Sequence, residues 1–247
     1  MSEIFNTYLY EPLLAVLVFI YQNIAFHDLG VSIILLTFLV RLVLFPLFYK
    51  SAKDQSLMQR LQPHIQKIQL DHKDNKEQQA RALMDLYKKH RLNPFSGFLL
   101  LLIQLPILIA LYQIFLKEIG NNIFTAHDFL GILDLGSKSV LLAVVAALLQ
   151  YLLGKMTMGA QPKSERSGQM FFQMKMMVYV APAFTFVILL NFPAALGIYW
   201  SASTLFSLLQ QVIINKKLPK LTHDRESDSK NKENGGPNGF RGTAGGA

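Results

Sequence analysis

The chain of 247 residues contains no cysteine. Disulfide bonds, thiolate chemistry and a lipid-modified N-terminal cysteine are therefore excluded. Charged residues are also scarce, at 16% of the chain, whereas a typical soluble domain carries about 25%. Hydrophobic residues make up 51%, and the mean hydropathy is positive, at +0.29. This balance indicates that a lipid bilayer is the solvent for much of the chain.

The N-terminus lacks the features of a targeting sequence. The segment MSEIFNTYLYEPL has no basic region of the kind that precedes the apolar core of a signal peptide, and it is not rich in arginine like an organelle presequence. We therefore expect Met1 to be the start of the mature chain.

A catalytic constellation is missing too. The histidines all lie outside the apolar segments and show no metal-ligand spacing: His27, His64, His72, His90, His127 and His223. We find no Ser–His–Asp arrangement, no glycine-rich phosphate loop and no pair of carboxylates at membrane depth. The sequence therefore favours a binding and guiding device over an enzyme, and we expect no metal and no cofactor.

What the chain does have is a set of long apolar runs. They predict five transmembrane helices, at 30–49, 98–117, 139–159, 174–191 and 195–215. Each is close to the ~20 residues that cross ~30 Å of hydrocarbon. The predicted fold class is therefore an all-α integral membrane protein with five transmembrane helices.

The orientation follows from lysine and arginine, which collect in cytoplasmic loops. Ten of them lie in residues 50–97, whereas the loop 118–138 holds only Lys138. The connection after the third span and the C-terminal segment are basic as well. Five spans then place the N-terminus outside and the C-terminus in the cytoplasm.

Residues 12–26, PLLAVLVFIYQNIAF, are apolar but cover only about 22 Å as a helix. The sequence HDLG follows almost at once, which leaves little chain for a turn between two membrane helices. We expect a helix that lies in the outer interface, within an N-terminal segment of residues 1–29. The alternative is a sixth span, which would move the N-terminus to the inside.

Residues 50–97 are predicted to form a cytoplasmic helical hairpin. Apolar residues recur at helical spacing before the break DHKDNK and again after it: Leu57, Leu61, Ile65 and Ile68, then Ala80, Leu83, Met84 and Tyr87. These stripes either pack on each other, with the basic residues as a solvated face, or dock on lipid head groups or a partner. Residues 98–217 hold the other four spans, and we expect residues 218–247 to be a disordered, basic cytoplasmic tail.

The first span carries one arginine, Arg41, with apolar neighbours on both sides in FLVRLVLFPL. A guanidinium at the centre of a spanning helix costs about 2.5–3.5 kcal/mol on insertion scales. No aspartate or glutamate lies in the five predicted spans, so Arg41 lacks a buried counter-ion and an ion-coupled transporter would lack its carboxylate. Snorkelling is the simple alternative, but the cytoplasmic interface at Lys50 is about 13 Å further along the helix. We therefore expect water to reach Arg41 through a cavity.

Polar residues elsewhere in the spans are candidates to line this cavity. Those in the last span follow steps of four, three and four along one face: Trp200, Thr204, Ser207 and Gln211. Thr37 lies one turn before Arg41, and Gln104 lies in the second span. Each alone is weak, because Ser, Thr and Gln often hydrogen-bond between membrane helices. Together with Arg41 they predict a wet, positively charged pocket.

Four stretches of the chain resemble one known family. They are GVSIILLTFLVRLVLFPL, LMQRLQPHIQKIQ, LMDLYKKHRLNPFSGFLLLLIQLPILIALYQ and FPAALGIYWSASTLFSLLQQ. Their order is similar to that of the YidC family of membrane protein insertases, which has mitochondrial and chloroplast relatives, and the resemblance covers residues 10–217. It implies five helices around a hydrophilic groove that is open to the cytoplasm and to lipid but closed on the outside.

The resemblance also implies which residues lie in the groove. The arginine of the family's first span matches Arg41, and the groove positions of the second and fifth spans match Gln104, Tyr199 and Trp200.

The chain departs from the family pattern at several positions. The usual proline at the start of the second span is Leu100, and the usual asparagine of the last span is Thr204. The segment Pro193-Ala194-Ala195 stands where the family has PAG or PSG. The large extracytoplasmic domain of some bacterial members is absent, so roles that depend on it are not expected.

The function implied by the resemblance is that of a membrane protein insertase or chaperone of the bacterial cytoplasmic (inner) membrane. It would guide apolar segments of newly made proteins into the bilayer through the groove, without ATP. The expected partners are nascent membrane proteins and the lipid bilayer, with the ribosome and a Sec-type translocon as further candidates, because the basic hairpin and tail suit ribosomal RNA. A small-solute channel or transporter is the alternative, favoured by a water-filled path that is open on both sides.

Overall fold

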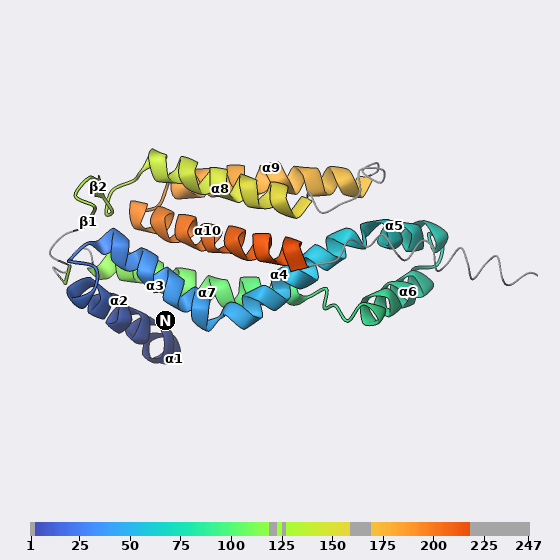
Figure 1. Ribbon diagram of the computed structural model, residues 1–247, viewed down its shortest axis with the longest axis horizontal. Coiled ribbons are helices and arrows are strands. Elements are labelled where there is room, and N and C mark those ends of the chain that lie inside the picture. The colour runs from blue at the N-terminus through green and yellow to red at the C-terminus, as the bar shows by residue number, and fades with distance from the viewer. Residues whose placement is uncertain (1–2, 119–122, 125–126, 159–168, 218–247) are drawn as a thin grey trace, which may run out of the picture. The chain divides into compact units, whose positions relative to one another are not determined.

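A computed structural model of the chain describes residues 3–118, 123–124, 127–158 and 169–217, and their regular secondary structure is helical apart from one short pair of strands (Figure 1). The elements are α1 (Glu3–Phe5), the π-helical segment η1 (Asn6–Tyr10), α2 (Glu11–Asn23), α3 (Leu29–Val43), α4 (Phe45–Arg60), α5 (Gln62–Asp71), α6 (Lys76–Lys89), α7 (Ser96–Glu118), β1 (Asp128–Phe129), β2 (Leu133–Asp134), α8 (Val140–Met158), α9 (Gln169–Leu189) and α10 (Ala194–Lys217). Residues up to Asn215 form one compact unit. The predicted tail, 218–247, lies outside the described residues.

The all-α membrane fold predicted from the sequence is confirmed. Three described segments are long and apolar enough to cross a membrane: Glu3–Asn23, Ser96–Glu118 and Val140–Thr157. The bent pair of α3 and α4 is a fourth if it is counted as one span. Length and composition thus give three or four spans in the described part of the chain, fewer than the five predicted, because α10 is long but carries polar side chains and the described apolar part of α9 is short.

The first span differs from its prediction as a single helix over 30–49. α3 ends at Val43, α4 begins at Phe45, and the two are bent by 74°. Pro46 explains the break, because it has no N–H to donate to the carbonyl of Leu42 and its ring collides with that carbonyl in a continuous helix. Arg41 therefore lies in the last turn of α3 and not in the middle of a straight span.

The N-terminal helix is longer than the sequence predicted. The interfacial helix expected over 12–26 is part of a helical segment of 21 residues, Glu3–Asn23, and the chain turns back within residues 24–28. Phe26 and His27 make this turn with φ of 53° and 64°, in the left-handed region. Residues 24–28 thus suffice for a turn between α2 and α3, which the sequence argument took to be too short. That α2 lies in the outer interface stays a prediction.

Asp28 fixes the start of α3. One carboxylate oxygen caps the helix by accepting a hydrogen bond from the backbone N–H of Val31 at 2.7 Å. The other accepts from the backbone N–H of Leu130 at 2.5 Å, in the loop that joins β1 to β2. Gly30 lies beside this loop, and a Cβ atom at that position would overlap the ring of Phe129. The turn before α3 and the strand pair thus form one packed unit.

The main core joins this turn to the helices. Tyr21 and Phe124 are fully buried and meet edge to face, with ring centroids 5.1 Å apart. Buried residues of α2, α3, α7, α8 and the start of α10 complete the cluster. Outside it, α7, α8 and α9 expose large apolar side chains, among them Leu102, Leu148 and Phe184. Exposed apolar surface of this extent is what hydrocarbon, not water, would cover.

The predicted hairpin over 50–97 contains α5 and α6, which turn back on each other (Figure 1). Its core is small, with Leu61, Ile65 and Leu92 buried and the partly buried Leu57, Leu83 and Tyr87 packed around them. The two apolar stripes therefore pack on each other in part. Two members of the second stripe, Ala80 and Met84, are exposed instead.

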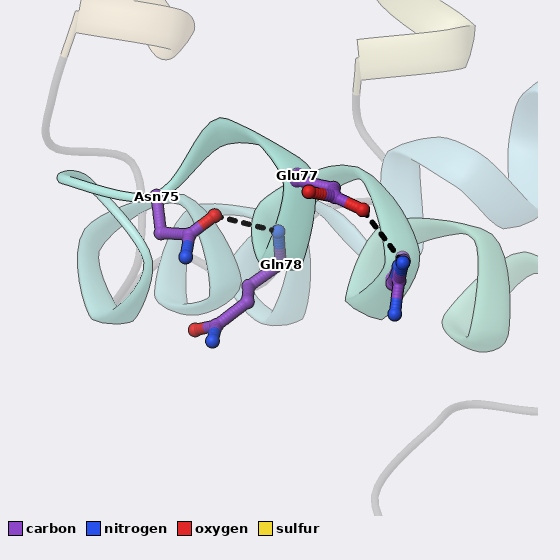
Figure 2. Close-up of polar contacts among 4 residues, drawn as sticks. Asn75, Glu77 and Gln78 are labelled. Atoms are coloured by element: carbon purple, nitrogen blue, oxygen red, sulfur yellow. Dashed lines mark hydrogen bonds and ion pairs between the residues drawn. The ribbon is translucent and has the colours of Figure 1, made fainter.

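The start of α6 shows why the hairpin turns where it does. The side-chain oxygen of Asn75 accepts a hydrogen bond from the backbone N–H of Gln78 at 3.0 Å and so caps the helix (Figure 2). One turn on, Glu77 pairs with Arg81 at 2.6 Å on an exposed face. Such an exposed pair adds little, at about 0.3–0.5 kcal/mol, so the cap is the stronger signal.

Gly30→Ala is expected to destabilise the protein, because the added methyl group overlaps the ring of Phe129 and overpacking costs about 1–3 kcal/mol. The measurement is the melting temperature in detergent. In a Phe129→Ala background the same substitution should cost much less. Simple addition of the two losses would mean that the two side chains do not touch.

Candidate functional site

α10 is bonded through its side chains to four other helices. Ser203 accepts from Arg41 of α3, and Tyr199 accepts from Gln104 of α7. Trp200 donates to Gln150 of α8 at 3.2 Å, and Gln211 donates to Ser56 of α4 at 3.0 Å. In Figure 1, α10 lies between α8 and α3, which agrees with these bonds. These four side chains of α10 thus face the other helices and bond them, whereas the hydroxyls of Thr204 and Ser207 donate to carbonyls of α10 itself.

Arg41 is the charged member of this set, and it is only 8% exposed. Its Nε donates to the hydroxyl of Ser203 at 3.1 Å, and its Nη2 donates to the same oxygen. The guanidinium carbon lies 4.1 Å from the centre of the Phe48 ring, in cation–π contact. Its place in the last turn of α3 also suits a cation, since the helix dipole is negative at that end.

No carboxylate is paired with Arg41 within the described ranges, where the ion pair present is that of Arg81 with Glu77. A buried charge without a counter-ion is normally costly. Here the C-terminal end of α3, the ring of Phe48 and the hydroxyl of Ser203 each offset part of this free-energy cost. The site therefore keeps an uncompensated positive charge.

Arg41 faces a cavity of about 360 Å³ between α3, α4, α7, α8 and α10. Half of the lining residues are polar: Arg41, Gln104, Gln150, Tyr199, Ser203, Thr204 and Ser207. The other half are apolar: Phe48, Gly97, Leu100, Leu105, Leu108, Leu153 and Trp200. We call this cavity the Arg41 pocket.

Six of the seven residues predicted to line a groove line the Arg41 pocket together: Arg41, Gln104, Tyr199, Trp200, Thr204 and Ser207. Thr37 does not. It is buried, and its hydroxyl donates to the carbonyl of Ile33 at 2.6 Å in its own helix. Gln211, predicted on the same face of the last span, lies outside the pocket and bonds Ser56 and Asn215.

Among the pocket residues that sequence reasoning missed, three contact a polar or charged side chain of the site: Ser203, Gln150 and Phe48. Ser203 had a signal, because Tyr199, Ser203 and Ser207 follow steps of four along one face of α10. Gln150 had one too, since it is the sole polar residue in the apolar run 140–154. Phe48 had none, because it reaches Arg41 only through the bend between α3 and α4.

A second, smaller cavity adjoins the Arg41 pocket. It measures about 200 Å³, lies between α7, α9 and α10, and has no polar atom exposed in it. Its lining is entirely hydrophobic or aromatic: Leu108, Ile109, Tyr112, Ile188, Leu189, Phe192, Leu196 and Trp200. Leu108 and Trp200 line both cavities. We call this cavity the apolar crevice.

The chemistry available in the site is that of binding. Arg41 is the charged group of the pocket, and the other polar groups are hydroxyls and amides, which can donate to and accept from a polar segment or water. Across the described ranges, no group of three or more His, Cys, Asp or Glu could hold a metal ion.

Fold and pocket together define a helical membrane protein with a pocket that holds one buried arginine, beside an apolar crevice. The chain belongs to the 60Kd inner membrane protein family, whose model matches residues 19–221. The resemblance drawn from the sequence is thus confirmed at the level of the family.

The curated relatives are named "Membrane protein insertase YidC". One from Geotalea uraniireducens is 36% identical over 209 residues, which cover 85% of this chain and 38% of that protein. One from Oceanobacillus iheyensis is 35% identical over 193 residues, which cover 76% of this chain and 75% of that protein. The chain thus spans little more than a third of the Geotalea relative but most of the Oceanobacillus one.

Ser203→Ala is expected to destabilise the protein by about 1.5–3 kcal/mol, because it removes the acceptor of a charged donor, Arg41. Ser207→Ala, one turn along the same helix, is the matched control. Its hydroxyl donates to the carbonyl of Ser203 at 3.1 Å and holds no charge, so we expect a change within about 0.5 kcal/mol. Unfolding in detergent measures both, and equal losses would contradict the role given to Ser203.

Proposed function

We propose that the protein is a membrane protein insertase, which guides apolar segments of newly made proteins into the bilayer. The observation that carries the proposal is the Arg41 pocket: a buried arginine without a carboxylate partner among the described residues, in a largely apolar cavity that six further polar residues help to line. Membership of a family whose curated relatives carry the name of an insertase supports it.

The mechanism we propose is that the pocket shortens the hydrophobic barrier. A polar N-terminal segment or short loop of the substrate enters water around Arg41, where acidic groups are attracted. α3 has 15 residues, or about 22 Å of helix, which is less than the ~30 Å thickness of a bilayer core. The polar segment therefore has less hydrocarbon to cross than elsewhere in the membrane.

The substrate's apolar helix then passes into lipid along the exposed apolar faces of the neighbouring helices. Transfer of that helix from water to hydrocarbon is favourable by about 25 cal/mol per Å² of apolar surface. The step therefore needs neither ATP nor a cofactor. The partners of this reaction are nascent membrane proteins and the surrounding bilayer.

The topology we propose keeps the helical segment Glu3–Asn23 in the outer interface, with the N-terminus outside, the C-terminus in the cytoplasm, and the Arg41 pocket open to the cytoplasm. It is supported by the ten basic residues of 50–97, which cytoplasmic loops favour. These cations also suit contact with ribosomal RNA, so the ribosome is a further proposed partner. A Sec-type translocon is another, on the basis of the family alone.

Reconstitution into liposomes tests the function directly. A single-span test protein made in the presence of the vesicles should become protected from protease, without ATP after its synthesis. Empty vesicles provide the background. Protection no greater than in empty vesicles would rule out insertion by the isolated protein.

A thiol-labelling experiment tests from which side of the membrane the pocket can be reached. The chain has no native cysteine, so the label reports on the introduced cysteine alone. Thr204→Cys should react with a membrane-impermeant maleimide added from the cytoplasmic face and resist it from outside, because Thr204 lines the pocket. Thr37→Cys is the matched control, since it is as buried but faces its own helix. Reaction of Thr204→Cys from both sides would favour a channel. No reaction of Thr204→Cys from either side would contradict a pocket that is open to the cytoplasm.

Substitution of Arg41 tests the capture of acidic segments. Arg41→Lys should insert substrates with acidic N-terminal tails better than Arg41→Ala, by about tenfold if one charge contact is worth about 1.4 kcal/mol. Substrates with neutral tails should respond much less to either change. If acidic and neutral tails respond alike, Arg41 acts through structure and not through charge.

A further inference from the structure

Arg41 lacks a counter-ion that its surroundings are built to accept. The guanidinium is buried, its protein partners are a neutral hydroxyl and a ring, and the cavity beside it is lined by the side-chain amides of Gln104 and Gln150, which carry N–H donors. Removal of a charge from water is costly unless an opposite charge and hydrogen bonds replace the water. An anion in the pocket would complete the site.

The apolar crevice indicates what the anion is attached to. It shares Leu108 and Trp200 with the Arg41 pocket, so the two cavities are adjacent, and it exposes no polar atom. An empty space of this kind deprives its walls of dispersion contacts, which a hydrocarbon chain would restore. The ligand that fits both cavities is an amphiphile with an acidic head and an acyl chain.

The bilayer is the source of such an amphiphile. Ile109 of α7 lines the crevice and is 41% exposed, and beside it on α9 the side chains of Phe184 and Val187 are exposed as well. These side chains belong to the apolar surface that hydrocarbon would cover, so the crevice opens toward lipid. Arg41 lies at the end of α3, the part of a spanning helix closest to head groups.

We propose that, when no substrate is present, the Arg41 pocket and the apolar crevice together hold one bilayer phospholipid with an anionic head group. Its phosphate lies against Arg41 and Ser203, and one acyl chain passes Trp200 into the crevice. The bound lipid supplies the missing counter-ion and keeps the pocket from closing. This proposal goes beyond the insertase function and does not depend on it.

Trp200 provides the probe, because it is the sole tryptophan of the chain and lines both cavities. The protein is reconstituted in neutral phosphatidylcholine vesicles with a small fraction of lipid that carries bromine in the middle of its acyl chains, which quenches tryptophan fluorescence on contact. We expect brominated phosphatidylglycerol to reach half-maximal quenching at about a tenfold lower fraction than brominated phosphatidylcholine. Equal quenching by the two lipids would overturn the proposal.

Variants separate the head-group contact from the chain contact. Arg41→Gln should abolish the preference for phosphatidylglycerol, whereas Arg41→Lys should keep most of it. Retention of the full preference in Arg41→Gln would overturn the contact with Arg41. In the unaltered protein, a fatty acid without bromine that relieves the quenching by brominated phosphatidylglycerol more effectively than unbrominated phosphatidylglycerol does would overturn the assignment to a phospholipid.

A substitution that adds bulk to the apolar crevice tests whether the acyl chain lies there. Ile109→Phe adds bulk at the mouth of the crevice, and we expect it to reduce quenching by both brominated lipids at least about twofold. Ile213→Phe is the matched control, because Ile213 is also 41% exposed but does not line the crevice. Equal effects of the two substitutions would show that the bromine is not in the crevice. No substrate is needed, so the outcome is independent of insertion activity.

Discussion

The break at Pro46 is the constraint on which the site depends. A continuous helix would carry Arg41 in its middle, with apolar neighbours above and below. Because Pro46 ends the hydrogen-bond ladder, α3 stops two residues after Arg41, and α4 leaves at 74°. This bend brings Phe48 over the guanidinium and carries Ser56 to the far end of α10. One proline thus sets the place of the charge at the end of α3 and brings Phe48 into the wall of the Arg41 pocket.

α10 carries most of the polar side chains that surround Arg41. A helix among apolar neighbours should be apolar, yet this one carries buried Ser203, Thr204, Gln210 and Gln211. Polar groups within a membrane must find partners in protein, since hydrocarbon offers none. Arg41 of α3 and Ser56 of α4 bond Ser203 and Gln211, and Thr204 donates to the carbonyl of Trp200 in its own helix. The first backbone N–H groups of α10 donate to the carbonyls of Ser137 and Leu135 at 2.7 and 3.1 Å. Its low hydropathy therefore reflects its place between other helices.

How far the sequence predicted this site depends on the kind of signal that each residue carries. A charge or an amide in an apolar run is visible in the sequence, and periodicity tells which of its neighbours share a face, so Arg41, Gln104 and the polar face of α10 could be predicted. Thr37 was assigned to the pocket by spacing alone, which cannot distinguish a hydroxyl that faces a cavity from one that bonds its own helix. Phe48 depends on a bend angle, which is a tertiary property.

The fold shows the same division. Long apolar runs predicted helices at nearly the right places, because run length is a local property. The N-terminal turn was missed because it needs Phe26 and His27 in the left-handed region, which non-glycine residues rarely adopt. The packing of Phe129 against Gly30 and the bond of Leu130 to Asp28 hold that turn in place, and they join segments about a hundred residues apart. Contacts of that range leave no trace in a single sequence.

The partners of Arg41 also bear on how tightly the pocket can hold what enters it. A carboxylate partner inside the protein would neutralise the arginine, and an incoming acidic group would then have to displace it. A hydroxyl and an aromatic ring leave the charge available, yet they also stabilise the empty state, so the gain on binding an anion is limited. A device that passes its cargo onward needs this balance, because a site that bound an acidic segment strongly would retain it. The neutral surroundings of Arg41 thus suit a pocket that its occupants enter and leave.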